Sequence, residues 1–568
     1  MNRSTDDTIE TDILGIGLGP ANLSFGALHE PVDGRQACFL EAAPFFQWHA
    51  GMMVPEGQLQ VSFLKDLVTT VDPTSKFTFL NYLAEQGTLH RFLIACATSG
   101  TYREEFEKYY RWSAERLSGV RWGHVVERVE ADGDRFEVTV RTTSGEVRAY
   151  ASTLVLGTGK QPYLPPFAAA LRGRRVMHSS DLMVGALDVA GKDVLVVGGG
   201  QSGGEVVDYL LSDTGALPAS LTWLSKRSGF QPLDDSPFTN EWFFPDYVDH
   251  FYALPRERRE SLLKTHRLAS DGISESTLRD IYRRLYYLDM AHAGQVRHHL
   301  RPACHVEALR PDGDRHVALV RELDGTGRFE VPADVIVFCT GYRGGLPAYL
   351  AGLDPQPRRD DGQLRISRDY RLDWGGPESL SIYVQNAAEH THGIADPNLS
   401  LAAWRSARII NAIYGRQVYD TEREQSTSRF GPVPTTVTAP TTVTVPPDTA
   451  PAETEAAPIG GGPLTVGFRC PERSPGGMSV EMAVLPGSDI RPVPFHSSRW
   501  EVPPGAVSDL DVHEVEEIWM VGSGRGRLVS DDDAIDVAPG DMVFMPSKVP
   551  HQVVNTGTEP LRIFSVWW

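Results

Sequence analysis

The pattern of hydrophobic and polar positions divides the chain into two structured stretches. Residues 11 to about 420 alternate short runs of Val, Ile and Leu with glycine turns and helical segments, the pattern of parallel strands connected by helices. Residues 464–568 carry short strand-like runs separated by turns such as Pro504-Gly505 and Pro539-Gly540, without helical periodicity. The sequence therefore predicts an α/β fold followed by a small all-β barrel.

The segment between these stretches, residues 425–463, is rich in Pro and Thr and poor in large apolar groups. Such a segment cannot bury enough surface to offset the entropy of ordering, so we expect a mobile linker. About 35 such residues have a mean span of roughly 30 Å or more. This span would keep the flanking parts at an effective concentration of about one millimolar, which makes transfer of a product between them feasible.

The first apolar run, residues 12–16, ends in a glycine-rich turn before a predicted helix. Glycines at this position let backbone N–H groups approach a pyrophosphate at the helix N-terminus. The next strand, residues 37–40, ends in a carboxylate at the distance expected of a ribose-binding residue. A glycine turn without a ligand is the alternative. The predicted cofactor contacts here are Gly15, Gly17, Gly19, Pro20, which departs from the usual motif, and Glu41.

A second strand, residues 193–197, leads into a complete G-x-G-x-x-G pattern and a helix. The strand at 221–224 is followed by a basic pair and no acidic residue, which favours the 2′-phosphate of NADPH over the free hydroxyl of NADH. A solvated basic pair is the alternative. We therefore assign FAD to the first turn and NADPH to the second. The predicted contacts are Gly198, Gly200, Gln201, Ser202, Gly203, Lys226 and Arg227.

Seven further segments form a recognisable series. They are residues 46–52 (FQWHAGM), 59–67 (LQVSFLKDL), 72–83 (DPTSKFTFLNYL), 103–106 (REEF), 235–241 (DSPFTNE), 334–342 (DVIVFCTGY) and 392–400 (HGIADPNLS). In this order they closely resemble the flavin-dependent N-hydroxylating monooxygenases that act on L-lysine or L-ornithine. The resemblance covers about residues 9–415.

The resemblance implies two Rossmann-like dinucleotide-binding domains and a small substrate-binding part. The FAD domain would span 9–190, the NADPH domain with segments of the substrate site 191–335, and the return to the FAD domain 336–420. The resemblance also implies roles for single residues. Gln60 would lie beside the flavin, Lys65 would pair with the substrate α-carboxylate, Arg103 would place the nicotinamide and Asn240 would hold the amino-acid end. Further expected contacts are Trp48, His49, Gly341 and Ser400 for the cofactors and Ser270 for the substrate.

The choice of substrate depends on residues 268–274 (LASDGIS), where ornithine-type members carry an Asn in a TNY-like segment. Together with residues 399–406 this difference favours L-lysine, with L-ornithine as the alternative. The resemblance implies that NADPH reduces the flavin, O2 forms a C4a-hydroperoxyflavin, and the substrate amine takes one oxygen atom. Only a neutral amine can attack, and a free lysine amine has a pKa of about 10.4, so we expect activity to rise above neutral pH.

The C-terminal part contains four residues spaced like metal ligands: Asp511, His513, Glu517 and His551. In an extended strand, positions 511, 513 and 517 would share one face, and a facing strand would supply His551. This set suits Zn²⁺, Fe²⁺ or Mn²⁺. Residues 505–517 and 540–555 resemble the two cupin motifs, although cupins usually place histidine where Asp511 stands. We therefore identify 464–568 as a cupin domain.

The fusion suggests that the cupin processes the hydroxylamine made by the first part. Metal cupins occur in families that convert acylated N-hydroxylysines into N–N bonded hydrazines, together with an amino-acid-activating domain that this sequence lacks. We therefore expect a separate activating enzyme as a partner. The alternative is a cupin that only senses ligands or assembles subunits, beside a plain N-hydroxylase for siderophore hydroxamates.

Composition and charge narrow the possible partners and the cellular location of the protein. A formal charge of −20 without a basic cluster excludes wrapping of nucleic acid or docking on anionic lipid. No run approaches the ~20 apolar residues of a membrane span, and the first ten residues lack the apolar core of a secretory signal, which predicts a cytoplasmic protein. Five cysteines without CxxC spacing indicate reduced thiols. The resemblance implies a homo-oligomer, either a tetramer or a dimer.

Overall fold

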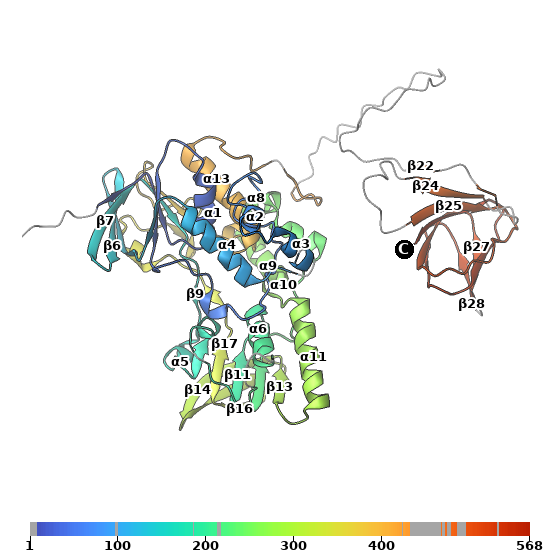
Figure 1. Ribbon diagram of the computed structural model, residues 1–568, viewed down its shortest axis with the longest axis horizontal. Coiled ribbons are helices and arrows are strands. Elements are labelled where there is room, and N and C mark those ends of the chain that lie inside the picture. The colour runs from blue at the N-terminus through green and yellow to red at the C-terminus, as the bar shows by residue number, and fades with distance from the viewer. Residues whose placement is uncertain are drawn as a thin grey trace, which may run out of the picture. The chain divides into compact units, whose positions relative to one another are not determined.

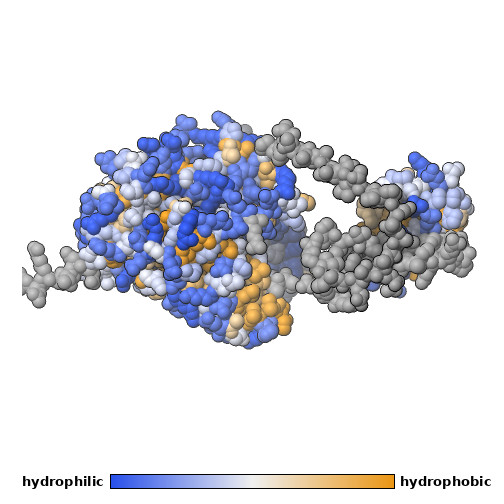
Figure 2. Space-filling model, turned by 90° about the horizontal axis from the view of Figure 1, so that it is seen from above, coloured by the Kyte–Doolittle hydropathy of each residue, from blue (hydrophilic) through white to orange (hydrophobic). Residues whose placement is uncertain are grey.

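The computed structural model describes residues 8–96, 100–185, 187–212, 217–422, 424–431, 467–468, 472–473, 479–484, 496–530 and 533–567. The chain forms two compact units, Met1–Val437 and Thr438–Trp568. This division agrees with the α/β and all-β stretches expected from the sequence. No helix within the described ranges is long and apolar enough to cross a membrane. Seen from above, the visible surface of the first unit is mostly hydrophilic, with a hydrophobic area gathered at one edge (Figure 2).

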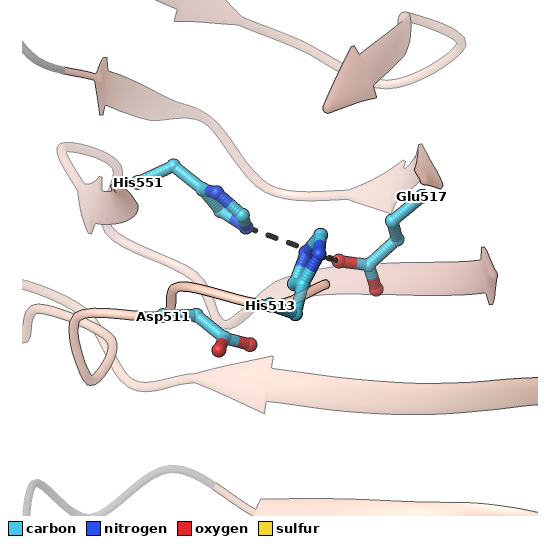
Figure 3. Close-up of side chains that lie close together, drawn as sticks. All are labelled: Asp511, His513, Glu517 and His551. Atoms are coloured by element: carbon cyan, nitrogen blue, oxygen red, sulfur yellow. Dashed lines mark hydrogen bonds and ion pairs between the residues drawn. The ribbon is translucent and has the colours of Figure 1, made fainter. Parts of the chain in front are cut away.

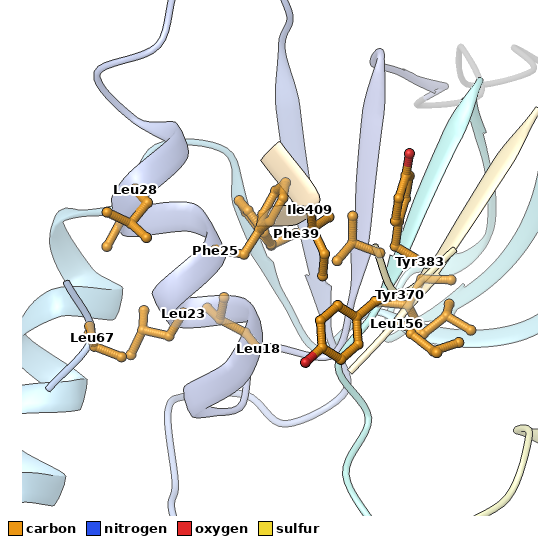
Figure 4. Packing of buried hydrophobic residues seen from close by; sticks show 14 of the residues in the cluster. Leu18, Leu23, Phe25, Leu28, Phe39, Leu67, Leu156, Tyr370, Tyr383 and Ile409 are labelled. Carbon is orange, nitrogen blue, oxygen red and sulfur yellow. The ribbon is translucent and has the colours of Figure 1, made fainter. Parts of the chain in front are cut away.

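The first parallel sheet has the strand order β21-β8-β2-β3-β4. Its strands are β2 (Ile13–Ile16), β3 (Ala37–Glu41), β4 (Val120–Trp122), β8 (Thr153–Leu156) and β21 (Ser381–Val384). Helices α1 (Pro20–His29), α4 (Arg103–Arg116) and α13 (Ala402–Tyr414) pack together beside it. Figure 4 shows Phe25 of α1 beside Phe39 of β3 and Ile409 of α13. Full burial of such side chains stabilises the fold by about 1.5–3 kcal/mol each.

A second, mostly antiparallel sheet of the order β1-β7-β6-β5 projects from this domain (Figure 1). Its strands are β1 (Ile9–Glu10), β5 (Val125–Asp132), β6 (Arg135–Thr142) and β7 (Gly145–Ala151). The smaller elements of the unit are α2 (Phe79–Glu85), α3 (Leu89–Cys96), α5 (Pro166–Ala169), β9 (Gln161–Pro162), β18 (Tyr342–Arg343), β19 (Arg359–Asp360) and β20 (Gln363–Leu364).

The other parallel sheet has the order β10-β17-β11-β12-β13. Its strands are β10 (Val176–His178), β11 (Asp193–Val197), β12 (Ser220–Leu224), β13 (Arg297–Arg301) and β17 (Val335–Phe338). Helix α11 (Glu275–Ala291) packs on α6 (Gln201–Leu210). An antiparallel sheet follows, made of β14 (Cys304–Asp312), β15 (Arg315–Glu322) and β16 (Arg328–Ala333). The range 191–335 expected for this domain leaves out β10 and ends at the first residue of β17. These two strands pair in parallel although they are far apart in the sequence.

The chain between β12 and α11 returns to the first domain. It forms α7 (Pro237–Asn240), α8 (Pro245–Ala253), α9 (Arg256–Thr265) and α10 (Arg267–Asp271). Helices α8 and α9 contact α12 (Glu389–His392), and Phe243, Val248 and Ala269 join the core around α1. This helical part falls within the range 191–335, where segments of the substrate site are predicted.

Residues 424–431, near the end of the first unit, pack against the helical part of that unit. The backbone N–H groups of Thr427 and Ser428 donate to the Glu241 carboxylate at 2.7 and 2.9 Å, and the Phe430 ring contacts Tyr247 at 4.6 Å. The beginning of the segment expected to be a mobile linker is therefore held by specific contacts. Residues 432–463 of that prediction lie outside the described residues.

The second unit is built of antiparallel strands (Figure 1). One sheet has the order β22-β24-β25-β31-β26-β29, with β23 also paired to β24, and the other has the order β28-β27-β30. The strands are β22 (Gly467–Phe468), β23 (Glu472–Arg473), β24 (Ser479–Val484), β25 (His496–Val502), β26 (Glu517–Ser523), β27 (Gly526–Ser530), β28 (Asp533–Val537), β29 (Met542–Met545), β30 (His551–Asn555) and β31 (Leu561–Trp567). Val502, Leu528, Val553 and Ile563 form part of its core, which confirms the all-β prediction.

Candidate functional site

A cavity of about 730 Å³ opens at the end of β2, between the two dinucleotide-binding parts. It is lined from one side by the turn after β2 and from the other by the start of α6. Many of the residues singled out in the sequence therefore meet at one place. Those that line it are Gly17, Gly19, Pro20, Glu41, Trp48, His49, Gln60, Arg103 and Gln201.

The turn after β2 is held in a fixed shape. Gly17 has φ +81°, a conformation that favours glycine, and a Cβ there would lie 2.9 Å from the Gly157 carbonyl oxygen. The N–H of Leu18 donates to Glu41 Oε2 at 2.7 Å. Gly15 does not line the cavity, since a Cβ at this position would meet the Phe39 ring at 2.3 Å. Gly15 therefore has a packing role, and its pyrophosphate contact stays a prediction.

A buried polar network supports this turn. The Asn22 amide donates to the Gly17 carbonyl at 2.7 Å and accepts from Gln385 Nε2 at 2.7 Å. Arg405 Nε donates to Gln385 Oε1 at 3.2 Å, and its guanidinium pairs with Asp396 at 3.4 Å. Arg405 also lines the cavity, although its side chain is only 2% exposed. Sequence reasoning missed this network because its members are separated by up to 383 positions, as between Asn22 and Arg405.

The second glycine turn packs closely on its neighbours. A Cβ at Gly203 would lie 2.1 Å from the Gly198 carbonyl, and Trp223 Nε1 donates to the same carbonyl at 2.8 Å. Arg227 lies beside Gly200 and donates from Nη1 to the Asp271 carbonyl at 2.9 Å. Of this group, Gln201 alone reaches the 730 Å³ cavity; those that do not are Gly198, Gly200, Ser202, Gly203, Arg227 and the exposed Lys226.

The two dinucleotide-binding parts are joined beside the cavity. Arg103 Nη2 pairs with Glu205 Oε2 at 2.7 Å, and both side chains are largely buried. Gln201 Nε2 donates to Glu205 Oε1 at 2.8 Å, and Gln60 Nε2 donates to Gln201 Oε1 at 3.1 Å. Arg103 Nε is buried and has no hydrogen-bond partner within the described residues. A buried donor without a partner is costly, so this atom is suited to bind a ligand.

None of the residues expected to bind the substrate, Lys65, Asn240 and Ser270, is among those that line the 730 Å³ cavity. Lys65 Nζ donates to Ser400 Oγ at 3.3 Å, so Ser400 contacts Lys65 and does not line the cavity as expected of a cofactor residue. Asn240 is exposed and donates to the Asp235 carbonyl at 2.8 Å. The Ser270 hydroxyl bonds only within α10 in the described residues. Gly341 lies next to the cavity-lining Tyr342 and accepts from His178 Nε2 at 3.0 Å.

Lys65 has an unusual electrostatic environment. Burial lowers the pKa of its ammonium group. No carboxylate of the described residues pairs with it, and its hydroxyl partner on Ser400 carries no charge. A half-buried cation of this kind is stabilised when an anion binds beside it. The site therefore fits the carboxylate of a ligand.

The four predicted metal ligands of the second unit lie together. One ligand atom from each of Asp511, His513, Glu517 and His551 is within 4.8 Å of the others, and Figure 3 shows both imidazole rings and Glu517 turned toward one another. The Nδ1 atoms of His513 and His551 face the carbonyl oxygens of residues 515 and 549 at 2.7 and 2.8 Å, so each Nδ1 carries the proton. Both Nε2 atoms are thereby left as ligands.

The donor set fits a divalent cation. Nε2 of His551 is buried and has no hydrogen-bond partner among the described residues. Nε2 of His513 lies 3.1 Å from Glu517 Oε2. When the His513 imidazole is neutral and carries its proton on Nδ1, His513 Nε2 and Glu517 Oε2 are both acceptors. A cation between these two atoms would bind both.

The backbone that presents these ligands differs from the expected one. Asp511 and His513 lie in the loop before β26, while Glu517 and His551 begin β26 and β30 on different sheets. The expectation that residues 511, 513 and 517 share one strand face is therefore wrong. Asp511 is held instead by paired backbone hydrogen bonds with His551, at 2.9 and 3.0 Å. Irregular loop pairing of this kind has no periodic signal in the sequence.

Residues 10–344 match the family model of L-lysine 6-monooxygenase/L-ornithine 5-monooxygenase, and residues 498–567 match the model of a cupin domain. L-lysine N6-monooxygenase of Escherichia coli is 38% identical over 410 residues, which are 72% of this chain and 96% of that protein. The chain therefore belongs to the L-lysine 6-monooxygenase/L-ornithine 5-monooxygenase family, and its C-terminal part is a cupin domain. This confirms the family expected from the sequence.

Two solved structures share the fold of the first unit. A cadaverine monooxygenase of desferrioxamine biosynthesis from Erwinia amylovora, bound to FAD, has a TM-score of 0.70 and 31% identity, covering 76% of this chain and 100% of that one. An ornithine N-hydroxylase from Kutzneria sp. 744, with reduced FAD, NADP⁺ and L-ornithine, has a TM-score of 0.66 and 29% identity, covering 72% and 99%.

Proposed function

We propose that the first unit hydroxylates the side-chain nitrogen of L-lysine with FAD, NADPH and O2. The observation that carries this proposal is Lys65, a half-buried ammonium group without a carboxylate partner in the described residues. An amino acid brings such a carboxylate, whereas a diamine does not. The resemblance of residues 268–274 to lysine-acting members favours L-lysine over L-ornithine.

The cofactors are assigned by the shapes of the two turns. The Gly17 turn and Glu41 would hold FAD at the 730 Å³ cavity, and the start of α6 with Arg227 would hold NADPH. The Kutzneria enzyme was solved with both kinds of cofactor. A bound flavin reduced by NADPH supplies the activated oxygen. Arg103, whose Nε has no partner among the described residues, would contact the nicotinamide nucleotide.

The cavity also suits a neutral amine. Its lining carboxylates within the described residues are Glu41, which accepts from two backbone N–H groups, and Glu205, which pairs with Arg103. Neither is free to hold the substrate nitrogen as an ammonium ion. The uncharged form that attacks oxygen is therefore favoured.

A direct comparison of substrates tests this proposal. Purified full-length protein is supplied with NADPH and with L-lysine, L-ornithine or cadaverine, and the products are identified by mass spectrometry. We expect N6-hydroxylysine and the highest kcat/KM for L-lysine. A higher kcat/KM for cadaverine than for L-lysine would overturn the role of the substrate carboxylate. A higher kcat/KM for L-ornithine than for L-lysine would overturn the choice of L-lysine.

We further propose that the cupin binds a divalent metal and acts on the hydroxylamine. A separate amino-acid-activating enzyme would first acylate the hydroxylamine oxygen. The amine of the acyl group then attacks the hydroxylamine nitrogen: an N–N bond forms, the N–O bond breaks, and the carboxylate stays on the same molecule. This step is an isomerisation and needs no oxidant. It is supported by the clustered ligands and by the covalent fusion of the two units.

Metal content and product analysis test this second proposal. We expect about one equivalent of metal in the wild-type protein and much less in His513→Ala and His551→Ala. With candidate activating enzymes present, we expect a hydrazine product that both variants fail to form. Identical products from all three proteins would overturn the catalytic role of the cupin.

A further inference from the structure

A second cavity, of about 290 Å³, lies over the metal ligands of the cupin. Three indole rings line it, from Trp500, Trp519 and Trp567. Trp500 and Trp519 pack edge to face, with centroids 4.8 Å apart and an interplanar angle of 76°, and both are largely buried. The volume is at the lower end of the range for ligand pockets, so the cavity fits a small metabolite.

The charge of this cavity is negative. Its described lining contains no Lys or Arg, but it contains the carboxylates of Asp509, Asp511 and Glu517. A divalent cation held by Asp511 and Glu517 would balance those two charges. Asp509 would then remain as the uncompensated carboxylate. Its side chain is exposed, and no described residue donates a hydrogen bond to it.

From these two features we infer that the cupin cavity binds a small primary ammonium ion. Indole faces attract cations through the negative face of the ring. Asp509 adds a charge-assisted hydrogen bond from the same cavity. A free carboxylate or phosphate ligand would meet the Asp509 carboxylate in the same cavity, and is disfavoured away from the metal.

The ammonium site gives the ligand an orientation, an assignment that rests on the proposed function of the first unit. N-hydroxylation makes the side-chain nitrogen of lysine much less basic, whereas the α-amino group stays an ammonium ion. The α-ammonium end would lie against the indoles and Asp509, and the hydroxylamine end would face His513 and His551. Unmodified lysine would bring an ammonium group, which has no lone pair, to the metal end, so the cavity would distinguish the product of the first unit from its substrate.

Three ligands of equal length test the ammonium site. The full-length, Zn²⁺-loaded protein is titrated calorimetrically with n-butylammonium, n-butyrate and n-butanol. We expect n-butylammonium to bind at least about tenfold more tightly than the other two. Asp509→Asn should weaken its binding about tenfold. The matched control Glu514→Gln removes a charge from the same loop, outside the cavity lining, and should change binding less than twofold.

A second measurement places the ligand. In Mn²⁺-loaded protein we expect faster relaxation of the butylammonium protons than in Zn²⁺-loaded protein, and no such difference in Trp567→Leu. The inference is overturned if butyrate binds as tightly as n-butylammonium or more tightly. It is also overturned if both Asp509→Asn and Trp567→Leu bind n-butylammonium as the wild type does. Failure of the proposed cupin reaction has a different signature, since product analysis then shows no metal-dependent product while the ammonium selectivity remains.

Discussion

Arg103 of α4 and Glu205 of α6 form a largely buried ion pair of 2.7 Å that joins the two dinucleotide-binding parts beside the cavity. The pair is extended by Gln201, which donates to Glu205, and by Gln60, which donates to Gln201. A guanidinium held in this way keeps a fixed position, and its buried Nε has no hydrogen-bond partner among the described residues. The arrangement couples the site expected for the flavin to the one expected for NADPH.

Glu205→Gln should slow reduction of the flavin by NADPH by about tenfold or more, because Arg103 loses its charged partner and its fixed orientation. Stopped-flow measurement of the flavin absorbance checks this. Glu107→Gln is the control, since Glu107 pairs with Arg111 at 2.6 Å within α4 and does not line the cavity. Unchanged reduction in Glu205→Gln, with normal FAD content, would contradict the role of the ion pair.

Lys65→Met should raise the KM for L-lysine by about 10- to 100-fold, because the substrate carboxylate loses a charge-assisted bond. Cadaverine lacks that carboxylate, so its KM should change little in the same variant. Steady-state kinetics with both amines give the comparison. A parallel loss for both substrates would indicate a general structural defect instead of carboxylate recognition.

Metal removal should destabilise the cupin unit. Binding to the folded state alone stabilises by about 4 kcal/mol when the free metal is at 1,000 times its Kd. Differential scanning calorimetry of full-length protein should show one transition moving to lower temperature with a chelator. His551→Ala should remove this response. His496→Ala should keep it, because His496 of the same unit stacks on Trp567 and is not one of the four ligands.

The first unit should lose stability in mild acid. Burial lowers the pKa of His392 to about 3 and that of His266 to about 4, below the ordinary value of 6.5. Below pH 6.5 the unfolded chain therefore binds protons that the folded chain does not, and the free energy of unfolding falls as the pH falls toward 4. The expected loss is about 2 kcal/mol per histidine at pH 5.

Denaturant titrations at pH 7 and pH 5 measure this loss. His266→Phe keeps a ring against Trp242 but cannot titrate, so the difference between the two pH values should shrink. His299→Phe replaces an exposed histidine and serves as the control. An equal pH difference in wild type and His266→Phe would rule out this histidine as a source of acid sensitivity.

The sequence predicted the parts of the fold that have local signals. The turns at Gly17 and Gly198 and the strands before them are short motifs whose backbone requirements can be seen in the residues themselves. The four cupin residues that the sequence singled out as a metal site, from their residue types and spacing, also lie together in the structure. Lys65 and Arg103 came from the family resemblance.

The remainder depends on contacts between distant residues. Glu205 gave no signal, because its partner Arg103 is 102 positions away and on another domain. Asp511 and His513 were predicted on a strand, but both lie in the loop before β26, where Asp511 pairs with the distant His551 through an isolated bridge. Strand β10 was missed as a member of the second sheet because parallel pairing with β17 joins residues 176–178 to residues 336–338.

The most direct measurement of the central claim is the fate of molecular oxygen. Full-length protein with FAD, NADPH, L-lysine and ¹⁸O2 should yield N6-hydroxylysine that carries one ¹⁸O atom, with NADPH consumed in proportion to product. The rate should rise between pH 6 and 9, because only the neutral amine reacts. NADPH oxidation that yields only hydrogen peroxide, with no labelled hydroxylamine from L-lysine at any pH, would contradict the account.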